Sequence, residues 1–158
     1  MIVHPIPPVY NEYSTLLILG SFPSVKSREE NFFYGHKKNR FWKVVSWVFD
    51  SEEPETVEEK KAFLLEKRIA LWDVIASCDI EGSSDSSIKN VIPNDISVIL
   101  DSSKIKRIFV NGKAAEKYYN KYIMPCVGIK AICLPSTSPA NAAWSLQELI
   151  CAWMIIKE

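Results

Sequence analysis

The chain has 158 residues, 47% of them hydrophobic and five of them tryptophan, which is enough for one globular domain with an adequate core, residues 1–158. Lys plus Arg and Asp plus Glu number 19 each, so the net charge of zero excludes the global basic field of a strong nonspecific nucleic-acid binder. The chain does not open on a basic leader, and no apolar run is long enough to span a bilayer. We therefore expect a soluble, cytoplasmic protein that makes no membrane contact and acts as a monomer.

The hydrophobic pattern predicts strands that alternate with helices. In chain order we expect a strand at 15–20, helices at 41–49 and 54–67, a strand at 68–74, a polar loop at 77–90, a helix at 93–100 with Pro93 in its first turn, a strand at 107–110, a helix at 114–122, a strand at 129–134 and a closing helix at 142–156. This alternation predicts an α/β fold, with a parallel sheet between helical layers.

The four cysteines lie far apart, and none of them forms a C-x-x-C pair. The spacing therefore suggests neither a zinc site nor an iron–sulfur cluster. We expect buried, reduced thiols and a protein without a metal or cofactor.

The segments that follow the four predicted strands should meet at one edge of the sheet. They begin at Gly20, Val74, Asn111 and Pro135. Ligands of open α/β sheets bind at the carboxyl ends of the strands. The segment from Gly20 to Trp42, rich in glycine, aromatic and cationic residues, is the strongest candidate for a site in this cleft.

The motifs at these strand ends form a recognisable set: G-S-F-P-S, F-Y-G-H-K-K-N-R-F-W, L-W-D-V followed by G-S-S-D-S-S-I, V-N-G, and L-P-S-T-S-P-A-N-A. In this order, the set resembles the hypoxanthine-DNA glycosylase (DNA-deoxyinosine glycosylase) branch of the uracil-DNA glycosylase superfamily. The resemblance implies a three-layer αβα sandwich with a four-stranded parallel sheet. It also implies a monofunctional enzyme that acts on DNA containing deaminated bases and leaves an abasic site in base-excision repair.

Two departures from the superfamily pattern bear on the chemistry. The Asp or Asn that usually follows two residues after the first glycine is Phe22 here, which cannot orient water. In the hypoxanthine branch the catalytic amide lies in the Y-G-H-x-x-N-R-F-W segment, which maps onto Asn39. Leu134 replaces the histidine of many uracil glycosylases, which makes a uracil specialist less favoured.

Breaking an N-glycosidic bond places positive charge on the sugar and negative charge on the departing base, so the site needs a positioned water and hydrogen-bond donors. Asn39 could hold this water with its amide oxygen. The alternative is that Asn39 only caps the helix that follows it.

Several residues could bind a flipped base. Asn111 could present its amide to the base edge, or could simply form the turn before Gly112. The aromatic rings could stack on the base or belong to the core. The histidine could donate to the leaving base, contact a phosphate or be incidental. These candidates are Phe22, Phe33, Tyr34 and His36.

Hydroxyl groups, backbone N–H groups and cations could hold the flanking phosphates. The candidates are Ser24, Ser83, Ser136, Ser138, Lys37, Lys38 and Arg40. The alternative is that the serines form ordinary turns and the cations are solvated. The wedge position, 139–141, holds only small residues, so its role stays open. Asp85 could orient Ser83 or a cation, or be a plain loop acid.

Three functions fit these residues. The first is hydrolytic removal of hypoxanthine from DNA, with uracil and xanthine as further candidate substrates. The second is a noncatalytic module that binds abasic or damaged DNA, which the missing acid at Phe22 permits. The third is a hydrolase of free nucleosides. No lysine is marked as a covalent nucleophile, so we expect hydrolysis without a lyase step.

Overall fold

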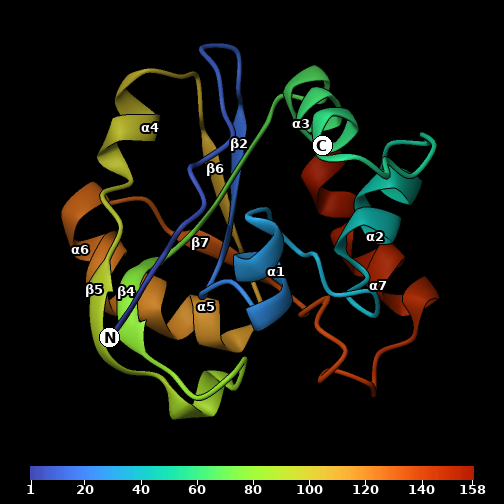
Figure 1. Ribbon diagram of the computed structural model, residues 1–158. Coiled ribbons are helices and arrows are strands. Elements are labelled where there is room, and N and C mark those ends of the chain that lie inside the picture. Colours follow the sequence, from blue (N-terminus) through green and yellow to red (C-terminus); the bar gives the residue numbers. More distant parts are fainter.

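A four-stranded parallel sheet forms the centre of the computed structural model, which describes all 158 residues. Its strands lie in the order β3 (Ile69–Asp73), β2 (Leu16–Gly20), β6 (Arg107–Asn111) and β7 (Ala131–Leu134). Figure 1 shows β2, β6 and β7 at the centre of the fold. Each strand is a short apolar run, and β2 is buried along its whole length. The four predicted strands are thereby confirmed, with boundaries shifted by one or two residues.

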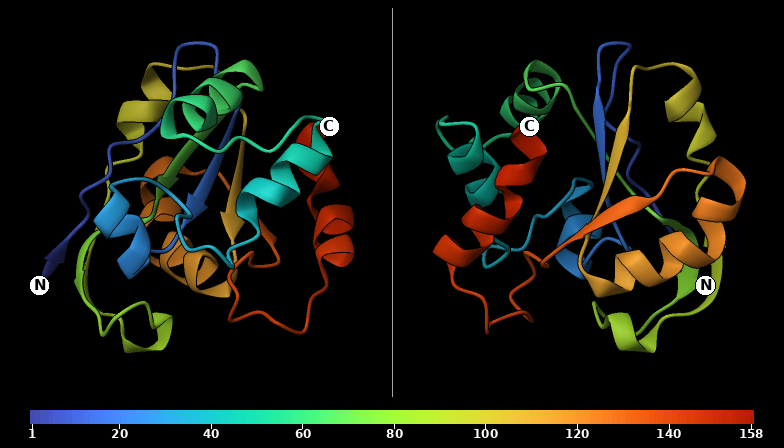
Figure 2. Two further views of the ribbon diagram at one scale, coloured as in Figure 1. Left: turned by 45° about the vertical axis from the view of Figure 1, so that its right-hand side comes forward. Right: turned by 180° about the vertical axis from the view of Figure 1, so that it is seen from behind.

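Helices cover both faces of this sheet. Figure 2 shows α2 (Phe41–Val48), α3 (Val57–Glu66) and α7 (Leu146–Trp153) on one side, and α4 (Ser97–Asp101), α5 (Lys113–Tyr118) and α6 (Met124–Val127) on the other. The side chains of β2 alternate between the two layers: Leu16 and Ile18 join the core beneath α2 and α7, whereas Leu17 and Leu19 join the core beneath α4 and α5. The expected three-layer αβα sandwich is confirmed.

A second, antiparallel sheet was not expected. It consists of β1 (Ile2–Val3), β4 (Ile75–Asp79) and β5 (Lys89–Pro93), in the order β1-β4-β5. The expected loop at 77–90 is therefore wrong at both ends, and only its tip, with the 3₁₀ turn η1 (Asp85–Ser87), is irregular.

The expected helix at 93–100 is wrong in its first half and confirmed in its second. Pro93 is the last residue of β5, and α4 begins only at Ser97. Because β5 is an edge strand, it tolerates a proline that cannot donate a backbone hydrogen bond. Proline at a helix start and proline at an edge-strand end look alike in sequence, and here the pairing of Pro93 with Ile75 decided between them.

Smaller differences lie at the helix ends. An unexpected short helix, α1 (Val25–Glu30), begins behind its cap Ser24. The closing helix starts at 146, not 142, because Ser145 forms a capping box with Glu148. The helix expected at 114–122 continues from α5 through a π turn, η2 (Tyr119–Ile123), and α7 ends in a 3₁₀ turn, η3 (Met154–Lys157).

The expectation of four buried thiols is wrong for three of them. Only Cys78 is buried, whereas Cys133 is half-buried and both Cys126 and Cys151 are exposed. All four are free thiols. No helix is both long and apolar enough to cross a bilayer, and no cluster of three or more His, Cys, Asp or Glu side chains could hold a metal ion.

Candidate active site

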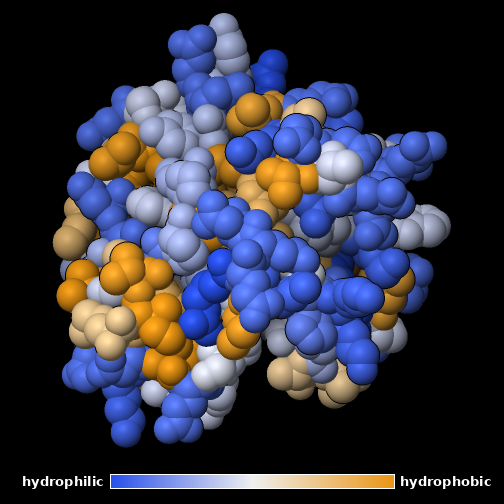
Figure 3. All heavy atoms as spheres, viewed as in Figure 1, coloured by the Kyte–Doolittle hydropathy of each residue, from blue (hydrophilic) through white to orange (hydrophobic).

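The sheet topology places a cavity where the direction of winding reverses. In chain order the strands are arranged second, first, third, fourth, so the switch point lies between β2 and β6, the position at which open α/β sheets bind ligands. A cavity of about 310 Å³ opens there. Figure 3 shows a mostly hydrophilic face that is indented at its lower edge, beneath α1. Ten of the predicted site residues line the cavity: Phe22, Ser24, Phe33, Tyr34, His36, Asn39, Ser83, Asn111, Ser136 and Ser138.

Asn111 organises one wall of this cavity. Its Nδ2 donates to the Tyr34 hydroxyl at 3.2 Å and to Thr137 Oγ1 at 3.0 Å, and its Oδ1 accepts from the Thr137 backbone N–H at 3.1 Å. Both amide hydrogens are thus used within the protein. The free hydrogen-bonding capacity of Asn111 is a remaining lone pair on Oδ1.

Gly112 lets β6 turn into α5 at this point. Its φ of +97° suits glycine, and a Cβ on it would lie 2.9 Å from the Ser136 Cβ. The close approach brings the segment after β7 against the end of β6. It explains why V-N-G and L-P-S-T-S occur at neighbouring strand ends.

Asn39 has two structural partners. Its Oδ1 accepts the backbone N–H of Phe41 at 2.9 Å and the Thr137 hydroxyl at 2.9 Å. The Phe41 contact holds the first turn of α2, so a capping role exists alongside any catalytic one. Because Phe41 N–H fixes which way the amide points, the group of Asn39 left without a protein partner is Nδ2.

Tyr34 adopts a strained backbone conformation beside the cavity. Its φ of 53° is unusual for a bulky residue, and its ring stacks on Phe41 with a centroid distance of 4.2 Å. Burial, together with the charge of the Asp73 carboxylate, raises the pKa of Tyr34 well above its ordinary value of 10.0 against the opposing hydrogen bond from Asn111. The hydroxyl therefore keeps its proton, and since its oxygen accepts from Asn111, that proton is available to a ligand.

The other aromatic candidates differ in exposure. Phe33 and Phe22 are buried at the cavity wall, at 2% and 8% exposure. His36 is exposed, and its Nδ1 accepts the backbone N–H of Lys38 at 3.1 Å while its carbonyl accepts that of Asn39. His36 thus shapes the turn that leads to Asn39.

The candidate serines form local turns, and they differ in whether their hydroxyl hydrogen is already bonded within the protein. Ser24 caps α1 and donates its hydroxyl to Ser27 Oγ at 3.0 Å. The hydroxyls of Ser136 and Ser138 instead accept backbone N–H groups, at 3.1 Å each, and Ser83 accepts that of Val25 at 2.9 Å. The hydroxyl hydrogens of Ser83, Ser136 and Ser138 therefore point to no protein acceptor.

The cations stand outside the cavity wall. Lys37 and Lys38 are exposed. The Arg40 guanidinium donates to backbone carbonyls of the segment after β7, among them Asn141 at 3.0 Å and Trp144. Arg40 therefore holds the cavity rim in shape, a role that its sequence position did not reveal.

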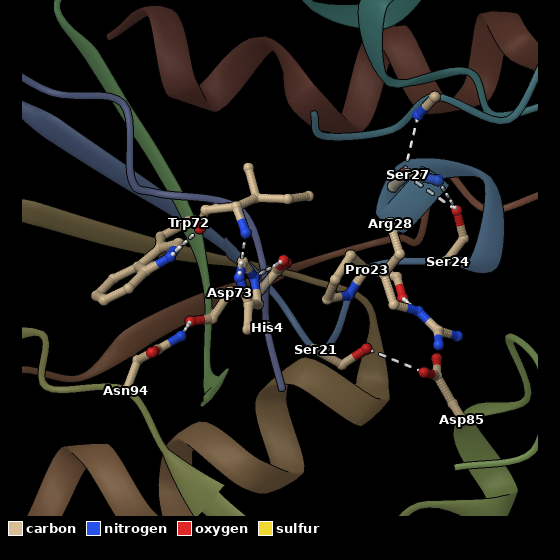
Figure 4. Close-up of polar contacts among 12 residues, drawn as sticks. His4, Ser21, Pro23, Ser24, Ser27, Arg28, Trp72, Asp73, Asp85 and Asn94 are labelled. Carbon is tan, nitrogen blue, oxygen red and sulfur yellow. Dashed lines mark hydrogen bonds and ion pairs between the residues drawn. The ribbon is translucent and has the colours of Figure 1, made fainter. Parts of the chain in front are cut away.

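Two residues that sequence reasoning did not single out form a buried pair at the cavity. Figure 4 shows His4 meeting Asp73, with Nε2 and Oδ2 2.7 Å apart. Their side chains are only 2% and 5% exposed. Asp73 ends β3 opposite Gly20, and a Cβ on Gly20 would lie 2.4 Å from its Oδ1. The same strand-end argument that selected Asn111 could have selected Asp73.

A second carboxylate stands at the rim. Asp85 Oδ1 accepts the Ser21 hydroxyl at 3.0 Å, a contact drawn in Figure 4. Desolvation raises the pKa of Asp85; the Ser21 hydrogen bond opposes this rise, and the charge of Asp73 adds to it. Asp85 thus pairs with Ser21 and not with Ser83, whose hydroxyl accepts from the Val25 backbone N–H.

Comparisons with known proteins agree with this fold. The family model of the uracil DNA glycosylase superfamily matches residues 7–156. A hypoxanthine DNA glycosylase of Methanosarcina acetivorans is 35% identical over 147 residues, 92% of each chain, and one of Methanosarcina barkeri is 31% identical over 137 residues, 85% of each chain. The solution NMR structure of a provisionally assigned uracil DNA glycosylase from M. acetivorans superimposes with a TM-score of 0.82 at 32% identity, over the full length of both chains. The protein therefore belongs to the uracil DNA glycosylase superfamily.

Proposed function

We propose that this DNA glycosylase hydrolyses the N-glycosidic bond of deaminated bases, chiefly hypoxanthine and secondarily uracil or xanthine, and leaves an abasic site. The observation that carries the proposal is the extended similarity to two relatives named hypoxanthine DNA glycosylase. The cavity supports it, because about 310 Å³ lies in the size range of small-ligand pockets, enough for one flipped base.

In the proposed reaction, the bond to the base lengthens before water attacks, so the site needs no strong base. Asn39 positions the water. Its Oδ1 already accepts two hydrogen bonds, so its free Nδ2 donates to the water oxygen, which keeps a second lone pair for attack at C1′. The base departs as an anion, and the proton that the water loses on addition to C1′ neutralises it. Asn39 thereby serves both the helix start and the reaction.

The base lies deeper than the sugar. Phe22 and Phe33 are the buried aromatic walls, and Asn111 acts on the base through the Tyr34 hydroxyl, which its Nδ2 orients. The hydroxyls of Ser136 and Ser138 donate to the flanking phosphates, since their hydrogens have no protein acceptor. The exposed Lys37 adds positive charge beside the DNA backbone.

The reaction ends at hydrolysis in this proposal. A lyase step would need a lysine amine at C1′, and no lysine lines the cavity.

The test is the formation of abasic sites on an inosine-containing duplex. We expect cleavage by the wild type, its loss in Asn39→Ala, and no change in Lys104→Ala, which alters an exposed cation away from the cavity. Binding of abasic DNA without cleavage of inosine, uracil or xanthine duplexes would refute catalysis and favour a binding module. A parallel assay with free deoxyinosine separates a DNA enzyme from a nucleoside hydrolase.

A further inference from the structure

The floor of the cavity carries a carboxylate oxygen with no protein partner. Asp73 is 3% exposed, and its Oδ2 is taken by His4 at 2.7 Å. No group of the protein donates a hydrogen bond to its Oδ1. Every side-chain oxygen that is fully shielded from solvent does have a partner, so Oδ1 must be in contact with solvent. Oδ1 therefore faces the cavity, which Asp73 lines. A buried carboxylate with one free oxygen calls for a donor from the ligand.

The hydrogen bonds of His4 fix which atoms of Asp73 accept. The Ile6 backbone N–H donates to His4 Nδ1 at 3.2 Å, so Nδ1 is an acceptor and the ring hydrogen lies on Nε2. Figure 4 shows the His4 ring against Asp73. Three aromatic rings, those of Phe22, Phe33 and Trp72, lie around the imidazole at centroid distances of 5.9 to 6.2 Å and hold it in place. His4 thus donates to Oδ2, and Oδ1 is presented as an acceptor.

The Tyr34 hydroxyl lies next to this acceptor. A Cβ on Gly20 would be 2.4 Å from Asp73 Oδ1 and 3.0 Å from the Tyr34 hydroxyl oxygen, so the two oxygens are near neighbours over the same glycine. The Tyr34 oxygen accepts from Asn111, which leaves its hydrogen free to donate. The floor therefore presents an acceptor and a donor side by side.

We propose that Asp73 and Tyr34 together recognise the lactam edge of the flipped base, with Asp73 Oδ1 accepting the ring N–H and the Tyr34 hydroxyl donating to the adjacent carbonyl oxygen. This inference rests on the proposed function and names the base chemistry that the site selects. The floor faces this edge because the glycosidic nitrogen lies on the opposite side of the base, toward the mouth.

The same pair rejects the amino parent of each deaminated base. Adenine offers a ring-nitrogen lone pair where hypoxanthine offers N1–H, and an amino group where hypoxanthine offers a carbonyl. In the same pose, the N1 lone pair of adenine would face the Asp73 carboxylate, and its amino group would face the Tyr34 hydroxyl hydrogen. Cytosine would meet the same two conflicts where uracil meets none. A site built on buried polar groups discriminates strongly because the wrong ligand leaves those groups unpaired. Guanine and thymine share the lactam, so other contacts must exclude them.

Asp73→Asn tests this inference because His4 dictates how the new amide lies. The ring N–H of His4 keeps the amide oxygen, so Nδ2 turns toward the cavity and the acceptor becomes a donor. We expect abasic-site formation at deoxyinosine to fall roughly ten- to a hundredfold, the worth of a hydrogen bond to a charged group. At purine deoxyriboside, which lacks both N1–H and the carbonyl, the rate should change less than about threefold or rise, since Nδ2 can donate to its N1.

Comparing two substrates within one variant cancels any loss that comes from misfolding. Tyr34→Phe should show the same pattern, with a penalty at deoxyinosine and little at purine deoxyriboside. Asp101→Asn, an exposed carboxylate on α4, is the matched control and should leave both rates unchanged. Equal losses on both substrates in Asp73→Asn would overturn the inference, because Asp73 would then serve catalysis or folding and not recognition.

A binding arm separates this inference from the proposed function. If the wild type releases no base from any duplex, the proposed function fails, yet calorimetry with free hypoxanthine and free adenine still tests the recognition. We expect the wild type to bind hypoxanthine more tightly than adenine, and Asp73→Asn to lose or reverse that preference. Equal affinity of the wild type for the two bases would refute the recognition even if deoxyinosine is cleaved.

Discussion

Replacing Asn39 should lower stability and activity by separable amounts. Asn39→Ala removes the acceptor of two hydrogen bonds, from Phe41 N–H and the Thr137 hydroxyl, each 2.9 Å long. At about 1 kcal/mol for each bond, the loss is about 2 kcal/mol of unfolding free energy. For a chain of this size, this corresponds to a melting temperature lower by roughly 4–8 °C.

Asn39→Asp separates the two roles. A carboxylate keeps an oxygen for Phe41 and Thr137, so its melting temperature should stay within about 2 °C of wild type. Its second oxygen replaces Nδ2 at the cavity and can accept a hydrogen from the water. We therefore expect Asn39→Ala to lose roughly 100-fold or more of single-turnover activity, while Asn39→Asp keeps a substantial part of it.

The assays are thermal melting and abasic-site formation well below every melting temperature. Thr56→Ala is the control, because it removes a helix cap of α3 outside the cavity and should cost about 1 kcal/mol without loss of activity. The reasoning is wrong if Asn39→Ala melts with the wild type, or if Asn39→Asp is destabilised as much as Asn39→Ala.

Three further experiments test other parts of the site. Gly20→Ala would place a Cβ 2.4 Å from Asp73 Oδ1, and we expect a loss of about 1–3 kcal/mol in chemical denaturation together with weaker base excision; an unchanged midpoint would contradict this crowding. Because the pKa of Asp85 is raised in the folded protein, the folded state binds this proton more readily and stability falls as pH rises above the ordinary value of 3.8. Asp85→Asn should therefore raise the melting temperature at pH 7 to 8, and the gain should vanish at and below pH 3.8; a gain that persists in acid would refute this assignment. Lys37→Ala should reduce the slope of DNA affinity against salt concentration by about one phosphate contact. Arg40→Lys, which disturbs bonds to the rim carbonyls, should weaken DNA binding without changing that slope. The same slope in the two variants would contradict this division of roles.

The sequence indicated those parts of the fold that depend on local pattern. Four apolar runs gave the parallel sheet, and their ends predicted where Asn39, Asn111 and Ser136 would gather. It did not indicate β1 or β5, since a two-residue strand and a polar edge strand carry little periodic signal.

The His4–Asp73 pair could not be predicted from local sequence pattern either. Asp73 stands at a strand end and could have been selected by position, but its partner is 69 residues away in sequence. The pairing depends on β1 lying against β4, and the His4 backbone N–H then donates to the Ala76 carbonyl at 2.7 Å. No pattern in the first five residues predicts this contact.

The bonds between α2 and the segment after β7 bear on how DNA is engaged. Arg40 and Asn39 fasten that segment through the Thr137 carbonyl and hydroxyl, and the Arg40 guanidinium holds its outer carbonyls. A rim tied at several points is preorganised, so little conformational entropy is lost when it meets a ligand. Free and DNA-bound forms of the protein should then differ by less than about 1 Å in this backbone. In the proposed reaction, the partner that moves is then the nucleotide, which leaves its stack to enter a cavity that is already formed.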